Sequence, residues 1–266
     1  AGFRSLLVSY AAVQASLGLR KGFNNKPDAA NPHSGIYLAA SVQVAGIGGD
    51  AQDIRLKPEM RAYVPISDSV TLGLRVTGGF LFPFNYGSAL FSSAGCAASD
   101  TSCQEQRTRD VQIMQLRGFY SGGTNSNRGY GFNGVNPREK VPSLFNDNAT
   151  IKAVPIGGRW LWDASLELRF PIYGSFGGAV FIDASDVWNE EAEAGFRPHL
   201  SPGIGLRYDT PVGPVRLDLG IRVPCAQLPG VMVLVPDDDL KKPDKTGGMC
   251  TTGSADQRER QRLGPS

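Results

Sequence analysis

Apolar and polar residues alternate along several stretches of this chain. Residues 53–64 read DIRLKPEMRAYV, in which one parity is apolar and the other is densely charged. The same period recurs in RWLWDASLELRF at 159–170 and in PVRLDLGIR at 214–222. Because successive side chains of a β-strand point to opposite faces, each stretch predicts a strand with one apolar and one charged face.

Weaker copies of this pattern bring the predicted strands to eight, at 5–20, 36–46, 69–82, 177–188 and 203–209. Short links join some of these strands, at 67–69, 173–175 and 211–213. Much longer connections alternate with them, at 83–157, at 189–199 and beyond 223. Short turns on one side and long loops on the other are typical of a transmembrane β-barrel.

Aromatic residues fall near the ends of the predicted strands, as the girdles of a membrane barrel would: Phe80, Phe82, Phe84, Tyr173, Trp188 and Tyr208. A water-soluble sandwich would expose its charged face and has no need for such girdles. We therefore predict an all-β fold, an antiparallel transmembrane β-barrel of about eight strands. Pro58 predicts a bulge or irregular pairing, and Gly78-Gly79 predicts a bend.

Composition excludes several other classes of protein. A chain of 266 residues is long enough for one barrel-like domain, and its net charge of +2 gives no reason to expect nucleic-acid binding. No apolar run is long enough for a transmembrane helix. Ala1 begins almost directly in a strand-like pattern, so either a signal peptide has been removed or the chain belongs to a longer protein.

The connection at 83–157 contains a Gly-rich stretch, SGGTNSNRGYGFNG at 121–134, with Arg128 in its middle. A single arginine in such a loop is usually only solvated. The spacing from Gly129 to Gly134 spells G-x-G-x-x-G, but no buried parallel strand precedes it and no helix pattern follows, so we predict no nucleotide site. Residues 224–266 are polar and do not alternate, which predicts a disordered outer loop or tail.

Candidate chemistry is sparse. The two histidines, His33 and His199, have no cysteine or histidine at metal-site spacing, and no nucleophile stands with a base, so we predict no metal, no cofactor and no enzymatic reaction. Four cysteines form two pairs close in sequence within outer loops. We predict two local disulfides, one between Cys96 and Cys103 and one between Cys225 and Cys250. Free thiols are the alternative.

Residues 117–130, RGFYSGGTNSNRGY, resemble the signature R-F-[FY]-x-G-G-x-x-S-x-R-G-[FY] of the BamA/TamA family of outer-membrane assembly factors, also called the bacterial surface antigen family. Further family motifs are matched in the same order along about residues 15–223: NPHSG at 31–35, RAYVPI at 61–66, GG at 157–158, SLELRFPI at 165–172, FIDASDVW at 181–188 and GIGLRYDTPVGP at 203–214.

The resemblance implies a fold and a site. Residues 1–223 are similar to the C-terminal half of a sixteen-stranded barrel whose long loop, here 83–157, folds into the lumen. The implied loop motif is Gly122, Gly123, Ser126, Arg128, Gly129 and Tyr130. Arg128 is expected to pair with Glu167 and Asp183 on the inner wall, and both carboxylates have the polar parity of their strands. Pairing of these carboxylates with Arg159, Arg169 or Arg207 instead is the open alternative.

The resemblance also implies a function. The implied protein is a non-enzymatic insertase or translocation factor of the bacterial outer membrane. The implied partners are outer-membrane lipid, client β-barrel or exported proteins, and periplasmic or lipoprotein accessory subunits. A two-partner secretion transporter of the same superfamily, a passive porin and a surface adhesin are the alternatives. The first strands, the last strand and the periplasmic repeats of the family have no match here, so a partial barrel is expected.

Overall fold

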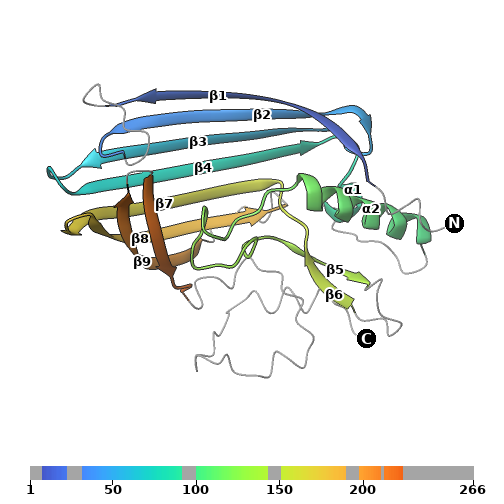
Figure 1. Ribbon diagram of the computed structural model, residues 1–266. Coiled ribbons are helices and arrows are strands. Elements are labelled where there is room, and N and C mark those ends of the chain that lie inside the picture. Colours follow the sequence, from blue (N-terminus) through green and yellow to red (C-terminus); the bar gives the residue numbers. More distant parts are fainter. Residues whose placement is uncertain are drawn as a thin grey trace.

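The computed structural model describes residues 8–22, 32–91, 100–142, 151–189, 198–210 and 213–223, to which all structural statements below refer. Eight strands form one curved antiparallel sheet in the order β1-β2-β3-β4-β7-β8-β9-β10 (Figure 1). Their bounds are β1 Tyr10–Lys21, β2 Gly35–Gly49, β3 Asp53–Pro65, β4 Thr71–Pro83, β7 Trp160–Tyr173, β8 Phe176–Trp188, β9 His199–Thr210 and β10 Gly213–Gly220. The predicted all-β fold is confirmed. Within the described residues β1 and β10 do not pair, so the sheet is open.

The two faces of the sheet differ as the alternation predicts. Apolar side chains of one parity stand on the outer face, where Leu17 is 68% exposed and Leu217 is 73% exposed. The opposite parity carries the polar residues, and the side chains of Asp53 and Asp183 are almost completely buried. An exposed apolar face opposite a buried polar one fits a strand between lipid and a polar lumen.

Pro58 disturbs the sheet less than predicted. It pairs in register with Ala40 of β2, while its pairing with β4 is interrupted between Leu56 and Glu59. The register is the same on both sides of the gap, so the irregular pairing is present but a bulge is not. Opposite the proline ring, a Cβ on Gly78 would lie 3.2 Å from Pro58 Cγ, which explains why a glycine fits there.

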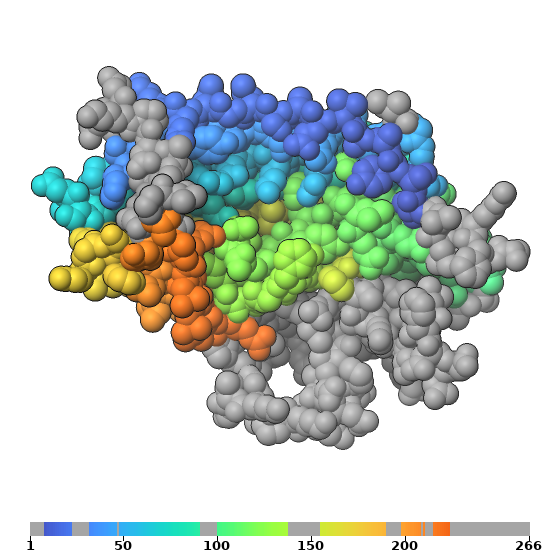
Figure 2. Space-filling model, in the orientation of Figure 1, coloured from blue at the N-terminus to red at the C-terminus, as the bar shows by residue number. Residues whose placement is uncertain are grey.

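The long connection between β4 and β7 has structure that the sequence analysis missed. It contains helix α1 (Ser88–Phe91), helix α2 (Thr101–Arg117) and a hairpin of β5 (Arg138–Pro142) and β6 (Ile151–Pro155). Asp100 caps α2 by accepting a hydrogen bond from the Cys103 backbone N–H at 3.0 Å. The loop lies on the concave side of the sheet, and Figure 2 shows its green residues between the blue and cyan strands and the orange strands.

The buried apolar core lies between this loop and one end of the inner face. It joins side chains of the loop to side chains of the sheet, namely Val111, Ile113, Met114, Phe119, Val135 and Ile156 from the loop and Leu81, Leu161 and Val187 from the strands. The loop is therefore packed against the sheet and not merely tethered at its two ends. None of the helices in the described part of the chain is long and apolar enough to cross a membrane.

Candidate functional site

The Gly-rich stretch folds into a tight turn that presents Arg128 to the sheet. Gly122 and Gly123 have φ of 102° and 108°, a region that favours glycine. A Cβ on Gly122 would lie 2.6 Å from the Gly131 carbonyl oxygen, so the two limbs of the turn approach too closely for a side chain. The Gly123 N–H donates to the Tyr130 carbonyl oxygen at 3.0 Å and closes the turn.

Arg128 reaches three carboxylates on the inner face. Its Nε and Nη2 donate to the two Asp183 oxygens at 2.8 and 2.9 Å, in a bidentate pair. Its Nη1 donates to Glu167 Oε2 at 2.7 Å and to Asp218 Oδ2 at 3.1 Å. We call these residues, together with Ser165, the Arg128 site. The structure brings both predicted partners to Arg128 and adds Asp218 on β10, which the sequence analysis had not assigned as a partner.

Neighbouring groups hold the guanidinium in this position. Its Cζ lies 3.3 Å from the centroid of the Phe181 ring, so one face of the planar cation stacks on an aromatic ring. Ser165 accepts from Nη2 at 3.2 Å and donates to Asp183 Oδ1 at 2.6 Å. Burial by itself would lower the pKa of Arg128, but the hydrogen bonds to Asp183 and Glu167 outweigh it and raise the pKa above its usual range. Arg128 is therefore charged at every accessible pH.

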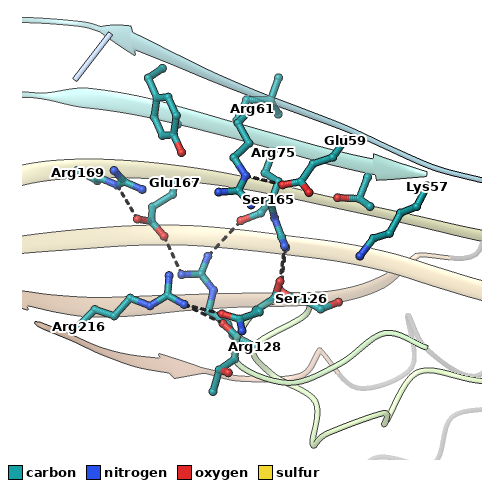
Figure 3. A pocket seen from close by; sticks show the side chains of 16 residues that line it. Lys57, Glu59, Arg61, Arg75, Ser126, Arg128, Ser165, Glu167, Arg169 and Arg216 are labelled. Carbon is teal, nitrogen blue, oxygen red and sulfur yellow. Dashed lines mark hydrogen bonds and ion pairs between the residues drawn. The ribbon is translucent and has the colours of Figure 1, made fainter. Parts of the chain in front are cut away.

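Glu167 also contacts two of the wall arginines named in the alternative, but in addition to Arg128 and not instead of it. Glu167 Oε1 accepts from Arg169 Nε at 2.8 Å and from Arg207 Nη2 at 3.1 Å, and Arg207 also pairs with Asp218. Figure 3 shows Arg128 reaching up from the loop toward Glu167 and Ser165 on the strand above. Glu167 thus accepts hydrogen bonds from Arg128 and from two wall arginines at once. Among the described residues no wall arginine pairs with Asp183.

The residues on either side of Arg128 approach the wall equally closely. The Gly129 N–H donates to Ser201 Oγ at 3.0 Å, and a Cβ on Gly129 would lie 2.3 Å from Ser201 Cβ. Ser126 donates to Asp163, which also accepts from Arg75 Nη2 at 2.7 Å. Tyr130 packs against the apolar core and lies edge-on to His199, with ring centroids 5.5 Å apart. Ser126, Arg128, Gly129 and Tyr130 of the predicted loop motif therefore all contact the inner face of the sheet, whereas Gly122 and Gly123 shape the turn that carries them.

A second arginine of the loop makes a contact that the sequence analysis missed. Arg117, at the end of α2, donates through Nε and Nη2 to the two Asp53 oxygens at 2.9 and 2.5 Å. Both side chains are buried, at 3% and 0% exposed. Tyr86 also donates to Asp53, at 2.9 Å. Two signals pointed to this pair: Arg117 begins the loop signature, and Asp53 has the charged parity of its strand.

The remaining predicted residues lie apart from this site. Cys103, near the start of α2, is disulfide-bonded, but Cys96, Cys225 and Cys250 lie outside the described residues, so the two pairings stay predictions. His33 Nδ1 contacts Thr71 Oγ1 at 3.0 Å. Among the described residues no group of three or more His, Cys, Asp or Glu side chains is placed to hold a metal ion. Residues 224–266 also lie outside the described part.

Known proteins are similar to this chain in sequence and in fold. The chain is 28% identical over 233 residues to chloroplastic outer envelope protein 80 of Arabidopsis thaliana, covering 82% of this chain and 28% of that protein. The fold matches a crystal structure of BamA from Haemophilus ducreyi lacking POTRA domains 1–3, with a TM-score of 0.56, 19% identity, and coverage of 79% of this chain and 38% of that chain. The chain thus spans well under half the length of either protein. The model of the Omp85 superfamily domain matches residues 11–227, and the chain belongs to that superfamily.

Proposed function

We propose that this chain is the barrel portion of a non-enzymatic factor that inserts other β-barrel proteins into an outer membrane or passes proteins across it. Membership of the Omp85 superfamily supports a protein insertion or translocation role at the level of the family. The fold similarity to BamA supports the same architecture. The finer assignments are part of the proposal: a bacterial outer membrane, client barrels or exported proteins as substrates, and periplasmic or lipoprotein accessory subunits.

One observation carries the proposal. The loop is held inside the concave face by a buried arginine with three carboxylate partners contributed by β7, β8 and β10. A loop that merely closed the outer end of a sheet would not need a charged side chain on three strands. Such a contact suits a loop whose position within the lumen has to be fixed, because the arginine fork specifies both direction and distance.

The test is client assembly by the full-length protein in its own membrane. Arg128→Ala removes the side-chain contacts but leaves the outer apolar face and the strand ladder unchanged, so the protein itself should still insert. Assembly of client barrels should fall, and residues 100–137 should become more sensitive to added protease. Phe132→Ala is the matched control, because Phe132 lies in the same loop and is 88% exposed. Wild-type client assembly and loop protection in Arg128→Ala would contradict the proposal.

Single-channel conductance distinguishes the proposed function from that of a passive porin. An in-folded loop occupies the lumen, so the intact protein should show small, infrequent openings in planar bilayers. Arg128→Ala should increase them by releasing the loop. A large, steady conductance of the wild-type protein would favour the porin instead.

A further inference from the structure

Two hollows lie on the inner face between the Arg128 site and the short turns of the sheet. Their volumes are about 470 Å³ and about 460 Å³. Both are lined by Arg61, Tyr63, Arg169 and Arg216, so they adjoin one another. The outer of the two reaches Gly22 and Pro32, next to the β1–β2 connection, and we call the two together the basic chamber.

Most charged side chains that line the basic chamber are positive, although Arg75 and Arg128 of the deeper hollow are paired with Asp163 and Asp183 behind it. The outer hollow adds Arg20 and Lys21 to the three shared arginines, and no Asp or Glu is among its described lining residues. The deeper hollow is lined by six basic side chains and by two acidic ones, Glu59 and Glu167. A concave site lined mainly by one sign of charge concentrates the electrostatic potential and attracts ligands of the opposite sign.

The three shared arginines are each held in place, but they do not all have a carboxylate partner of their own. Arg61 pairs with Glu59 and also lies over the Tyr37 ring, at 5.7 Å from the centroid. Arg169 lies over the Tyr63 ring at 5.4 Å and shares Glu167 with Arg128.

Arg216 points from β10 toward the loop, as Figure 3 shows. It donates to neutral oxygens, the Thr124 carbonyl at 3.4 Å and Asn125 Oδ1 at 3.0 Å. Aromatic rings and loop oxygens therefore hold these guanidinium groups in position. Together, the lining guanidinium groups carry more positive charge than the nearby carboxylates can balance.

We propose that the basic chamber binds a carboxylate-rich extended segment of a client polypeptide that enters from the short-turn end; this rests on the proposed function. Arginine forks match carboxylates bidentately, and the chamber is mostly arginine. Side chains on one face of an extended strand recur about every 7 Å, so alternate acidic residues would meet successive arginines. The chamber opens on the charged face of the strands and not on the apolar face, which favours a polypeptide over a lipid headgroup.

The experiment measures binding of a fluorescent peptide of about ten residues to the full-length protein in detergent micelles, with glutamate at alternate positions. A peptide with glutamine at those positions is the control ligand. The acidic peptide should bind with an affinity that falls as salt is added, and the glutamine peptide should bind at least about tenfold more weakly. Equal binding of both peptides would overturn the proposal. Inorganic phosphate that displaces the peptide as well as unlabelled peptide does would show a general anion site and overturn it too.

Variants locate the peptide on the chamber. Arg216→Gln should weaken binding of the acidic peptide about fivefold, because Arg216 is exposed and its contact is screened. Arg216→Lys, which keeps the charge, should retain most of the affinity. Arg107→Gln is the distant control, since Arg107 lies in α2 and lines neither hollow.

Arg61→Gln removes a second arginine shared by both hollows. An equal loss of peptide affinity in Arg107→Gln, or no loss of affinity in either Arg216→Gln or Arg61→Gln, would place the peptide outside the chamber. Client assembly by the same wild-type preparation separates the two proposals. Assembly without binding of the acidic peptide rejects only the chamber, while intact assembly in Arg128→Ala rejects the proposed function.

Discussion

The three carboxylates around Arg128 should contribute very unequally to loop docking. The perturbation is one amide substitution at each: Asp183→Asn, Glu167→Gln and Asp218→Asn. Asp183 accepts from the Arg128 backbone N–H, from its Nε and Nη2, and from the Ser165 hydroxyl. It is 1% exposed, so none of these bonds is replaced by water in the docked loop.

The magnitudes follow from these contacts. Asparagine at 183 keeps one acceptor oxygen but turns an N–H₂ toward Arg128 Nη2 and removes the buried counter-charge. A hydrogen bond to a charged group contributes about 1.5–3 kcal/mol, and breaking a buried pair costs up to about 5 kcal/mol, so we expect a loss of about 2–4 kcal/mol of docking free energy. Glu167→Gln and Asp218→Asn each keep an acceptor oxygen, weaken a single Arg128 bond and leave Asp183 in place. For these we expect about 1 kcal/mol or less.

Hydrogen exchange of the backbone amides of residues 119–135, measured by mass spectrometry on the full-length protein in micelles, reads this free energy directly. Each 1.4 kcal/mol is about tenfold in the opening equilibrium, so Asp183→Asn should speed exchange about 30-fold or more and the other two about fivefold or less. Exchange in the strands should not change. Equal effects of the three variants, or a larger effect of Glu167→Gln than of Asp183→Asn, would refute the assignment of Asp183 as the main partner.

Three further results are expected. Arg117→Met leaves the buried Asp53 carboxylate with the Tyr86 hydroxyl as its remaining side-chain donor among the described residues, so proteolytic protection of α2 should fall by about 3–5 kcal/mol, and Arg117→Met with Asp53→Leu should recover most of it. A membrane-impermeant thiol reagent should label cysteine introduced at Arg61 in preference to cysteine at Leu217 or Leu219, and the reverse preference would contradict the assignment of the two faces. Mass spectrometry of non-reduced peptides should find Cys96 linked to Cys103 and Cys225 linked to Cys250, whereas a link between Cys96 and Cys225 would show that both pairings are wrong.

The sheet could be predicted from the sequence because its signal is local. Residues 162–170 of β7 alternate strictly between apolar and polar side chains, and this two-residue period alone assigns Glu167 to the inner face. The strand ends differ by a few residues, as at β9, which begins at His199 and not at 203. His199 and Leu200 follow the alternation of β9, but the Ser201-Pro202 pair after them does not read as strand, since proline cannot donate to a ladder.

Helix α2 was missed because its sequence is polar on most sides and shows little amphipathic period. Its apolar residues gather near its end, at Val111, Ile113 and Met114. Other signals were available: Asp100 is a helix-capping residue, no glycine or proline occurs within 101–117, and Gly118 follows Arg117. The residues at the two ends of the segment therefore predict the helix, although its hydrophobic periodicity does not.

The two loop arginines together couple distant strands, which no single motif could predict. Arg117 pairs with Asp53 on β3, whereas Arg128 pairs with carboxylates on β7, β8 and β10. Strands β4 and β7 lie between β3 and β8 in the sheet. The short segment between the arginines therefore spans the concave face from one part of the sheet to another. Because each arginine fork tolerates little displacement, a change in curvature that moves β3 relative to β8 must break one of the two pairs or move the loop with the sheet.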